Sequence, residues 1–184
     1  YGDFLTQCIW GSKGRVTLEG RRLTVEQEGE RFVIVNADGS RPIVRERWDR
    51  GHDQDRGYYA KYEHADKITK SLYQAKSARQ DAGEVRRYVN LFYTESGEGR
   101  RDLDLRVLDD RRVVVTGGEA PVIVGLGPWE TADAKLDAKM FVLSGDRLCL
   151  ADVTSAQGPG LELTANQPSD VAIQLPSGEI TQAP

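Results

Sequence analysis

The sequence has few of the residues on which many catalytic and metal sites depend. It contains two cysteines and two histidines among 184 residues. There is no Cys-x-x-Cys pair and no Cys/His cluster, so a structural zinc site built on cysteine is not indicated. Gly-x-Ser-x-Gly is absent, and Gly125-Leu126-Gly127 lacks the glycine, lysine and helix of a phosphate-binding loop. The chain therefore carries no motif typical of a serine hydrolase or a nucleotide-binding protein.

Long apolar runs and an excess of charge of one sign are also missing. No run of about 18 apolar residues occurs, so no membrane-spanning helix is predicted within the chain. The formal net charge is −4, with acidic and basic residues interspersed, so electrostatics predict neither a nucleic-acid nor a membrane partner. Because the chain begins at Tyr1 rather than at a methionine, we interpret it as a processed chain or a domain of a larger parent protein.

The two cysteines, Cys8 and Cys149, both have apolar neighbours in the sequence. Two buried free thiols are the favoured interpretation, because free cysteine behaves as a small hydrophobic residue. A disulfide that links the N-terminal segment to a late strand is the alternative.

Alternating apolar and polar residues dominate the rest of the chain. Pairs of short apolar segments flank glycine or acidic turns at residues 19–22, 109–112 and 144–147, which is typical of hairpins. Such segments recur at intervals of about 8–12 residues. The sequence therefore predicts an all-β fold, an antiparallel β-sandwich of about 12–15 strands. We expect one domain over residues 1–184, with residues 1–12 as a docking segment and residues 13–184 as the sandwich.

Residues 67–94 are predicted to be the centre of this fold. Residues 85–93 are apolar on both alternation sets, as in a strand with neighbours on both faces. A helix competes over residues 65–82, where good helix formers are frequent, but the apolar residues there form no continuous helical stripe. We therefore predict two long strands folded back on each other at residues 79–83. Residues 128–133 are predicted to be a loop.

Both histidines lie in or near a polar, glycine-bounded loop. Histidine has an ordinary pKa that suits proton transfer near neutrality, so the alternative catalytic residues are His52, His64 and Tyr62. Asp53 and Asp55 are the alternative metal ligands, with calcium as the candidate ion. The favoured interpretation is a solvated loop without a metal or a cofactor, because the full calcium-loop pattern is absent.

Aromatic and arginine side chains gather in or beside the predicted loops. Sugar rings present apolar C–H faces that pack on aromatic rings, and arginine binds carboxylates through forked hydrogen bonds. The candidate ligand-binding residues are Trp48, Arg50, Arg56, Tyr58, Tyr59 and Trp129. Trp129 is the one expected to be most exposed. A tryptophan in a sandwich more often lies in the core or plugs the end of a strand, so this placement competes with the binding role for each of them.

Residues 72–75, 81–84 and 88–93 resemble the C-terminal β-sandwich region of large bacterial polysaccharide-degrading proteins of the heparinase II/III-like type. The later order of strands is similar, so the resemblance covers roughly residues 60–180, and it includes no catalytic motif. It implies a secreted or periplasmic parent protein that acts on an acidic polysaccharide. In that family the lyase residues lie chiefly on a helical toroid domain, so none is transferred to this chain.

Three hypotheses of different classes remain. The leading one is a non-catalytic accessory domain of a secreted carbohydrate-active protein, structural and glycan-contacting. Its expected partners are a carbohydrate and other domains of the parent protein. The second is a polysaccharide lyase that uses histidine and tyrosine in acid–base chemistry on uronides. The third is a protein–protein interaction module that uses free sheet edges.

Overall fold

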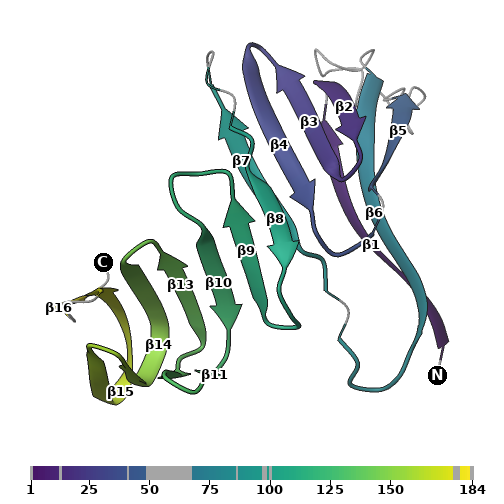
Figure 1. Cartoon of the computed structure of the whole chain (residues 1–184). Coiled ribbons are helices and arrows are strands. Elements are labelled where there is room, and N and C mark those ends of the chain that lie inside the picture. Colours follow the sequence, from purple (N-terminus) through teal and green to yellow (C-terminus); the bar gives the residue numbers. More distant parts are fainter. Residues whose placement is uncertain are drawn as a thin grey trace. The chain divides into compact units, whose positions relative to one another are not determined.

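The computed structural model describes residues 2–12, 14–40, 42–48, 68–85, 87–96, 99, 101–175 and 179–182. The chain folds into two compact units, unit 1 (residues 1–100) and unit 2 (residues 101–184). All the regular structure in the described ranges is β, in sixteen strands whose pairings are antiparallel (Figure 1). The predicted all-β, antiparallel fold class is therefore confirmed. Within these ranges no helix has the length and apolar character needed to cross a membrane.

Unit 1 consists of two sheets. One has the strand order β1-β6-β5 and the other the order β2-β3-β4-β7 (Figure 1). The strands are β1 (Gly2–Ser12), β2 (Arg15–Glu19), β3 (Arg22–Gln27), β4 (Glu30–Asn36), β5 (Pro42–Trp48), β6 (Ile68–Gln80) and β7 (Asn90–Glu95). The predicted hairpin around Gly20 is confirmed as β2–β3, and this glycine has φ of 59°, a backbone conformation that glycine adopts without steric cost.

The two sheets of unit 1 are held together by a small apolar core. Its buried residues are Leu23, Val25, Ile34 and Leu72. Leu72 comes from β6 and the others from β3 and β4, so the cluster joins the two layers as in a sandwich. Burial of each such side chain contributes about 1.5–3 kcal/mol, so this cluster stabilises the packing of the two sheets.

The two strands expected within residues 67–94 are present, but they do not pair with each other. β6 is a strand rather than a helix, and it lies at the centre of its sheet between β1 and β5. The turn exists, since the Glu84 amide donates to the Asp81 carbonyl over 3.1 Å. However, β7 pairs with β4 in the other sheet, so the predicted hairpin is wrong. The chain changes layers after the turn, and each half finds its partners elsewhere.

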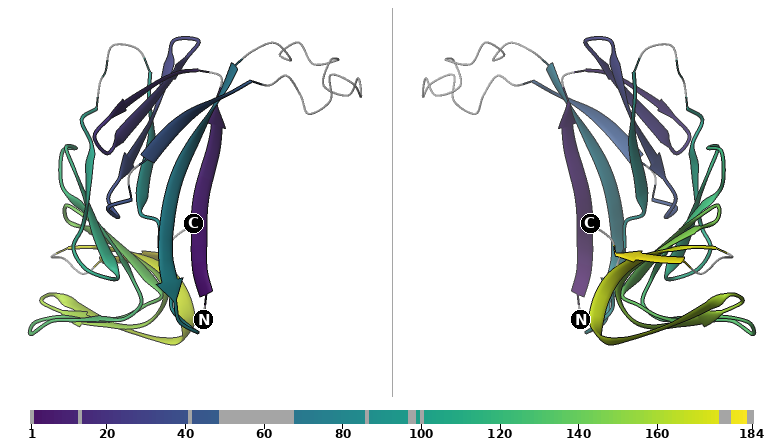
Figure 2. Two further views of the ribbon diagram at one scale, coloured as in Figure 1. Left: turned by 90° about the vertical axis from the view of Figure 1, so that its right-hand side faces the viewer. Right: turned by 90° about the vertical axis from the view of Figure 1, so that its left-hand side faces the viewer.

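Unit 2 is built on one large sheet that curls (Figure 2). Its main strand order is β11-β12-β14-β13-β10-β9-β8, and β15 pairs with both β14 and β16. The strands are β8 (Asp104–Val107), β9 (Arg112–Thr116), β10 (Val122–Leu126), β11 (Trp129–Glu130), β12 (Lys135–Asp137), β13 (Met140–Ser144), β14 (Arg147–Gly158), β15 (Leu161–Gln174) and β16 (Glu179–Gln182). Among the side chains that the structure describes, its buried cluster is larger than that of unit 1 and includes Phe141, Leu148, Leu150, Val153, Val171 and Ile173.

Most local predictions for unit 2 are confirmed, and two are corrected. The hairpins around residues 109–112 and 144–147 form as β8–β9 and β13–β14. The predicted loop at residues 128–133 contains the short strand β11. The sequence predicts two short strands at residues 161–163 and 171–175, separated by a turn at residues 166–169, but the structure has the single strand β15 there. Its pairing with β14 shifts register between Leu150 and Ser155, and such irregularities let a strand continue through a proline such as Pro168.

The remaining predictions concern the N-terminal segment, the two cysteines and the number of domains. The docking segment of residues 1–12 is strand β1, paired with β6 along its whole length. Cys149, half-buried in β14, is a free cysteine, which agrees with the thiol interpretation, whereas the side chain of Cys8 lies outside the described part. The expectation of one domain over residues 1–184 stays a prediction, since a division into two compact units does not decide whether they fold as one domain.

Candidate functional site

Most of the residues predicted to form a site lie outside the part of the chain that the structure describes. These are Arg50, His52, Asp53, Asp55, Arg56, Tyr58, Tyr59, Tyr62 and His64. Trp48 ends β5, but its side chain also lies outside the described part. Trp129 is therefore the one predicted site residue whose surroundings are known. In the described ranges, no group of three or more His, Cys, Asp or Glu side chains could hold a metal ion.

A pocket of about 260 Å³ opens beside Trp129 in unit 2. One side is the β8–β9 turn, and the other is formed by the β10–β11 connection and β13. The lining residues are Asp109, Asp110, Arg111, Arg112, Leu126, Pro128, Trp129 and Phe141. The pocket thus has an aromatic side and a charged side, which is the composition expected of a site for a small polar ring with apolar faces.

The charged side of the pocket is ordered by Asp109. Its Oδ1 accepts hydrogen bonds from the amides of Arg111 and Arg112 over 2.9 and 2.8 Å. Its Oδ2 accepts from Nε of Arg112 over 2.6 Å, and Nη2 completes a forked ion pair. The hydrogen bond from Arg112, followed by the one from the Arg111 amide, holds the pKa of Asp109 below its usual value. Asp109 is therefore a carboxylate at neutral pH and a poor proton donor.

The two arginines of this turn have different surroundings. Arg112 is bound to Asp109 and also lies over the Trp129 ring, with Cζ 5.6 Å from the ring centroid. Arg111 is exposed, and its guanidinium has no hydrogen-bond or ion-pair partner among the described residues. Arg111 is therefore the cation of the pocket that remains available to an anionic ligand.

The aromatic side is a stacked pair on the edge of the unit 2 core. The rings of Trp129 and Phe141 have centroids 5.4 Å apart and an interplanar angle of 24°. Phe141 is buried and Trp129 is half-buried, packed against the same cluster. Trp129 therefore lies between the two sequence-based expectations, neither fully exposed nor in the core, and it presents part of its indole to the pocket.

Gly125 provides the space in which this pair is packed. It lies opposite Phe141 in the β10–β13 pairing. A Cβ atom at Gly125 would lie 2.1 Å from a carbon of the Phe141 ring, far closer than van der Waals contact allows. The phenyl ring therefore lies directly over the glycine, and this position supports the stack with Trp129.

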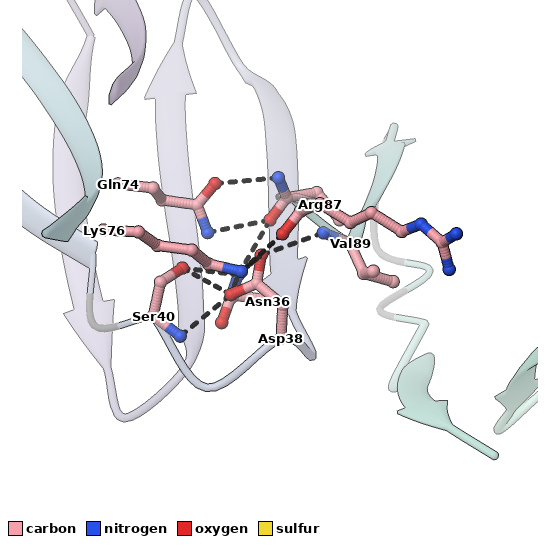
Figure 3. A network of polar contacts seen from close by, with 8 residues as sticks. Asn36, Asp38, Ser40, Gln74, Lys76, Arg87 and Val89 are labelled. Atoms are coloured by element: carbon pink, nitrogen blue, oxygen red, sulfur yellow. Dashed lines mark hydrogen bonds and ion pairs between the residues drawn. The ribbon is translucent and has the colours of Figure 1, made fainter. Parts of the chain in front are cut away.

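Unit 1 contains a second polar cluster, which surrounds Asp38 (Figure 3). Oδ1 of Asp38 accepts from the Ser40 amide over 2.8 Å, from the Ser40 hydroxyl, and from Nδ2 of Asn36 over 3.1 Å. Oδ2 accepts from the Val89 amide over 2.9 Å and forms an ion pair with Lys76 over 3.3 Å. The side chain of Asp38 is only 5% exposed.

The Asp38 cluster is a structural connection rather than a binding site. Burial raises the pKa of Asp38, but the hydrogen bonds from Ser40, Asn36 and Val89 together lower it further, so that the net pKa lies below the usual value. Both carboxylate oxygens are fully engaged, which leaves no open position for a ligand. Nearby, Gln74 and Asn90 exchange two side-chain hydrogen bonds of 2.9 and 2.7 Å. The cluster thus joins β6 of one sheet to the β4 and β7 segments of the other.

Sequence reasoning found Trp129 but missed its neighbours. Residues 109–112 were interpreted only as a hairpin turn, and Phe141 only as part of a strand. The available signal was the composition Asp-Asp-Arg-Arg, which is more highly charged than a hairpin turn requires. The pairing of β9 with β10 places this turn beside Trp129.

The pocket beside Trp129 is therefore the candidate site of the described part of the chain. It can bind a ring through aromatic contact and an anion through Arg111. Comparisons with family models, with curated proteins and with solved structures found no match to this chain.

Proposed function

We propose that this chain is a non-catalytic, glycan-contacting β-domain of a carbohydrate-active protein, and that the pocket beside Trp129 binds one sugar ring. The observation that carries the proposal is the pocket itself, in which the Trp129–Phe141 stack faces the charged turn of residues 109–112. Its volume of about 260 Å³ is just below the range of about 300–1,000 Å³ typical of drug-sized ligands. One sugar ring fits this size better than a longer segment does.

The charges of the pocket favour an acidic sugar. Asp109 already neutralises Arg112, whereas Arg111 has no partner among the described residues. A uronate carboxylate accepts two parallel hydrogen bonds from a guanidinium, while the apolar face of the ring packs on the indole. Asp110, which is exposed at the rim, has oxygens that accept hydrogen bonds from sugar hydroxyls.

The resemblance of residues 60–180 to the sandwich region of heparinase II/III-like proteins supports the same class of ligand. It also motivates the cellular setting that we propose, a secreted or periplasmic parent protein. A binding role fits the pocket better than a catalytic one, because its best-ordered carboxylate, Asp109, is held ionised by Arg112. Such a carboxylate cannot serve as a general acid near neutral pH.

The test is a screen of the full chain against neutral and uronate oligosaccharides, followed by titration calorimetry on any ligand found. Trp129→Ala is expected to weaken binding about 30-fold, the effect of losing a contact worth about 2 kcal/mol. Arg111→Gln is expected to weaken uronate binding about 10- to 100-fold, since a hydrogen bond to a charged group contributes about 1.5–3 kcal/mol. Its effect on a neutral sugar should be small.

Arg147→Gln is the matched control, because Arg147 is an exposed arginine in another hairpin of unit 2. It should bind as the unmodified chain does. Thermal unfolding of Trp129→Ala must show an intact fold, since Trp129 also packs on the core. Absence of binding to every sugar would overturn the glycan role, and equal losses in Arg111→Gln and Arg147→Gln would place the ligand elsewhere.

A further inference from the structure

Strand β1 forms one rim of its sheet. It pairs with β6 over all eleven residues, from Gly2 opposite Gln80 to Ser12 opposite Lys70. Among the described residues no strand pairs with its other side, and Figure 2 shows it at the edge of the three-stranded layer. An edge strand presents alternating unpaired N–H and C=O groups, and these form a template for another strand.

Nothing in the sequence of β1 protects this edge. Proteins usually block edge strands with proline, lysine, bulges or a short length. β1 has no proline and no lysine, its single charge is Asp3, and its pairing with β6 has no register shift. The opposite edge of the same sheet differs, because β5 begins with Pro42 and continues with Arg45, Glu46 and Arg47. The sequence of β5 thus has features that disfavour pairing with a further strand, whereas the sequence of β1 does not.

The residues of β1 are also symmetric by chemical type about Gln7. Counting outward from Gln7, Thr6 matches Cys8, Leu5 matches Ile9, and Phe4 matches Trp10. Two identical strands that pair antiparallel are related by a two-fold axis. An axis at Gln7 sets small residues opposite small ones, aliphatic opposite aliphatic, and aromatic opposite aromatic, which are favourable cross-strand pairs.

Neighbouring registers lack this match. An axis at Thr6 sets Asp3 opposite Ile9, and an axis at Cys8 sets Thr6 opposite Trp10. With the axis at Gln7, Asp3 faces Gly11, so the like charges of the two copies are not opposed. The pattern therefore selects one occupant, a second copy of the same strand, and one register.

We propose that β1 pairs antiparallel with β1 of a second copy of this chain, centred on Gln7, so that the two three-stranded sheets become one continuous sheet. This inference is independent of the sugar pocket, which lies in the other unit of the chain. It gives a concrete form to the role expected of free sheet edges, with the chain itself as the partner.

The first test is the mass of the full chain in solution, measured by light scattering over a dilution series. The unmodified chain is expected to approach twice its monomer mass of 20.5 kDa at high concentration. Gln7→Lys and Gln7→Glu each set like charges directly opposite across the axis, and each is expected to stay monomeric. An equimolar mixture of the two variants should regain the dimer, because the charges opposite each other then have opposite sign.

Position 7 suits this test because substitutions there should leave unit 1 folded. Gln7 pairs with the half-buried Ala75, whereas the buried Leu72 and Gln74 belong to the other alternation set. Gln27→Lys, at the exposed end of β3, is the matched control and should dimerise normally. Equal thermal midpoints for the variants and the unmodified chain verify the fold.

The second test is a crosslink on the axis. Residues directly opposite in an antiparallel pair have Cα atoms about 4.5–5.5 Å apart, within the range for a disulfide. Gln7→Cys, with Cys8→Ser and Cys149→Ser, should form a covalent dimer on oxidation, and Gln27→Cys in the same background should not. An unmodified chain that stays at 20.5 kDa throughout the dilution series would overturn the proposal. So would a dimer that both charged variants leave unchanged.

Discussion

At the scale of single residues, Asp38 shows how a buried charge can hold two layers together. The carboxylate accepts four hydrogen bonds and forms an ion pair with Lys76, which comes from the other sheet. Lys76 in turn donates to the Arg87 carbonyl and lies 4.9 Å from the centroid of the Tyr88 ring. Removing the charge would leave several donors without an acceptor, which costs more than the bonds themselves contribute.

Asp38→Asn should lower the free energy of unfolding of unit 1 by about 2–4 kcal/mol at neutral pH. The amide keeps one acceptor but replaces the other oxygen with a donor that faces the Val89 amide or Lys76. Denaturant titration measures the change. Asp133→Asn, at an exposed turn in unit 2, is the control and should change stability by less than about 0.5 kcal/mol. A similarly small effect at Asp38 would contradict the structural role.

The same residue should make stability depend on pH. The pKa of Asp38 is lower in the folded chain than the value of about 3.9 in an unfolded one. Its contribution is therefore fully present above about pH 4, and it is lost as the pH falls through the folded pKa. The stability gap between the unmodified chain and Asp38→Asn should therefore stay constant down to about pH 4 and narrow from there to the acid limit of folding. A gap that does not narrow below about pH 4 would be inconsistent with an ionised Asp38.

Sequence alone predicts only part of this cluster. The Asp38-Gly39 pair predicts a turn, and the turn is there, with Gly39 at φ of 78°. The burial of Asp38 could not be predicted, because the Val89 amide that it binds lies 51 residues away. An acidic turn residue is usually exposed, and only the arrangement of the two sheets makes this one a connection.

At the scale of elements, the pairing of β10 with β13 depends on one glycine. Gly125→Ala would set a methyl group within 2.1 Å of the Phe141 ring, so the ring must move and the stack with Trp129 must change. We expect a loss of about 1–3 kcal/mol, as for other overpacked cores, together with weaker ligand binding in the pocket. Thermal unfolding and near-ultraviolet circular dichroism measure the two effects.

Gly118→Ala is the matched control for this change. A Cβ at Gly118 would have its nearest neighbour at 3.8 Å, an ordinary contact, so stability should change little. If both alanine variants behave alike, the ring of Phe141 is not fixed by the glycine beneath it.

The elements also show where local patterns are sufficient. The hairpins β2–β3, β8–β9 and β13–β14 were predictable because each closes over a short turn with its own residue preferences. The partners of β6 were not predictable, because β1 and β5 are not joined to it by short turns and their sequences do not distinguish β6 from other apolar strands. The sequence predicts two strands in place of β15, because Pro168 lies between the two apolar segments and a proline within a strand ordinarily ends it.

At the scale of the whole molecule, each compact unit has its own apolar core. The buried cluster of unit 1 contains residues from β3, β4 and β6, and that of unit 2 lies entirely within residues 136–173. The all-β class was predictable from alternation alone, whereas this division was not, since turn-rich sequences look alike on either side of a boundary. Likewise, Trp129 was predictable as a residue of the candidate site, whereas the positions of Phe141 and of the charged turn beside it depended on the strand pairing.

A fragment of residues 101–184 is expected to fold alone, because the buried cluster described for unit 2 lies within residues 136–173. It should show the circular dichroism of a β protein and a cooperative thermal transition. The control is the full chain with Asp38→Asn, in which the transition belonging to unit 2 should stay at its original temperature. A fragment without cooperative unfolding would instead support one domain over residues 1–184.

The long separation between β1 and β6 has a consequence for how the chain is made. Paired residues lie from 58 positions apart, for Ser12 and Lys70, to 78 apart, for Gly2 and Gln80. At a synthesis rate of about 5–20 residues per second, β1 emerges about 3–16 s before its partner. The delay between β14 and β15 is much shorter, because a tight turn joins these two strands. During this delay both edges of β1 are open, and nascent chains on neighbouring ribosomes could meet through it before either has folded.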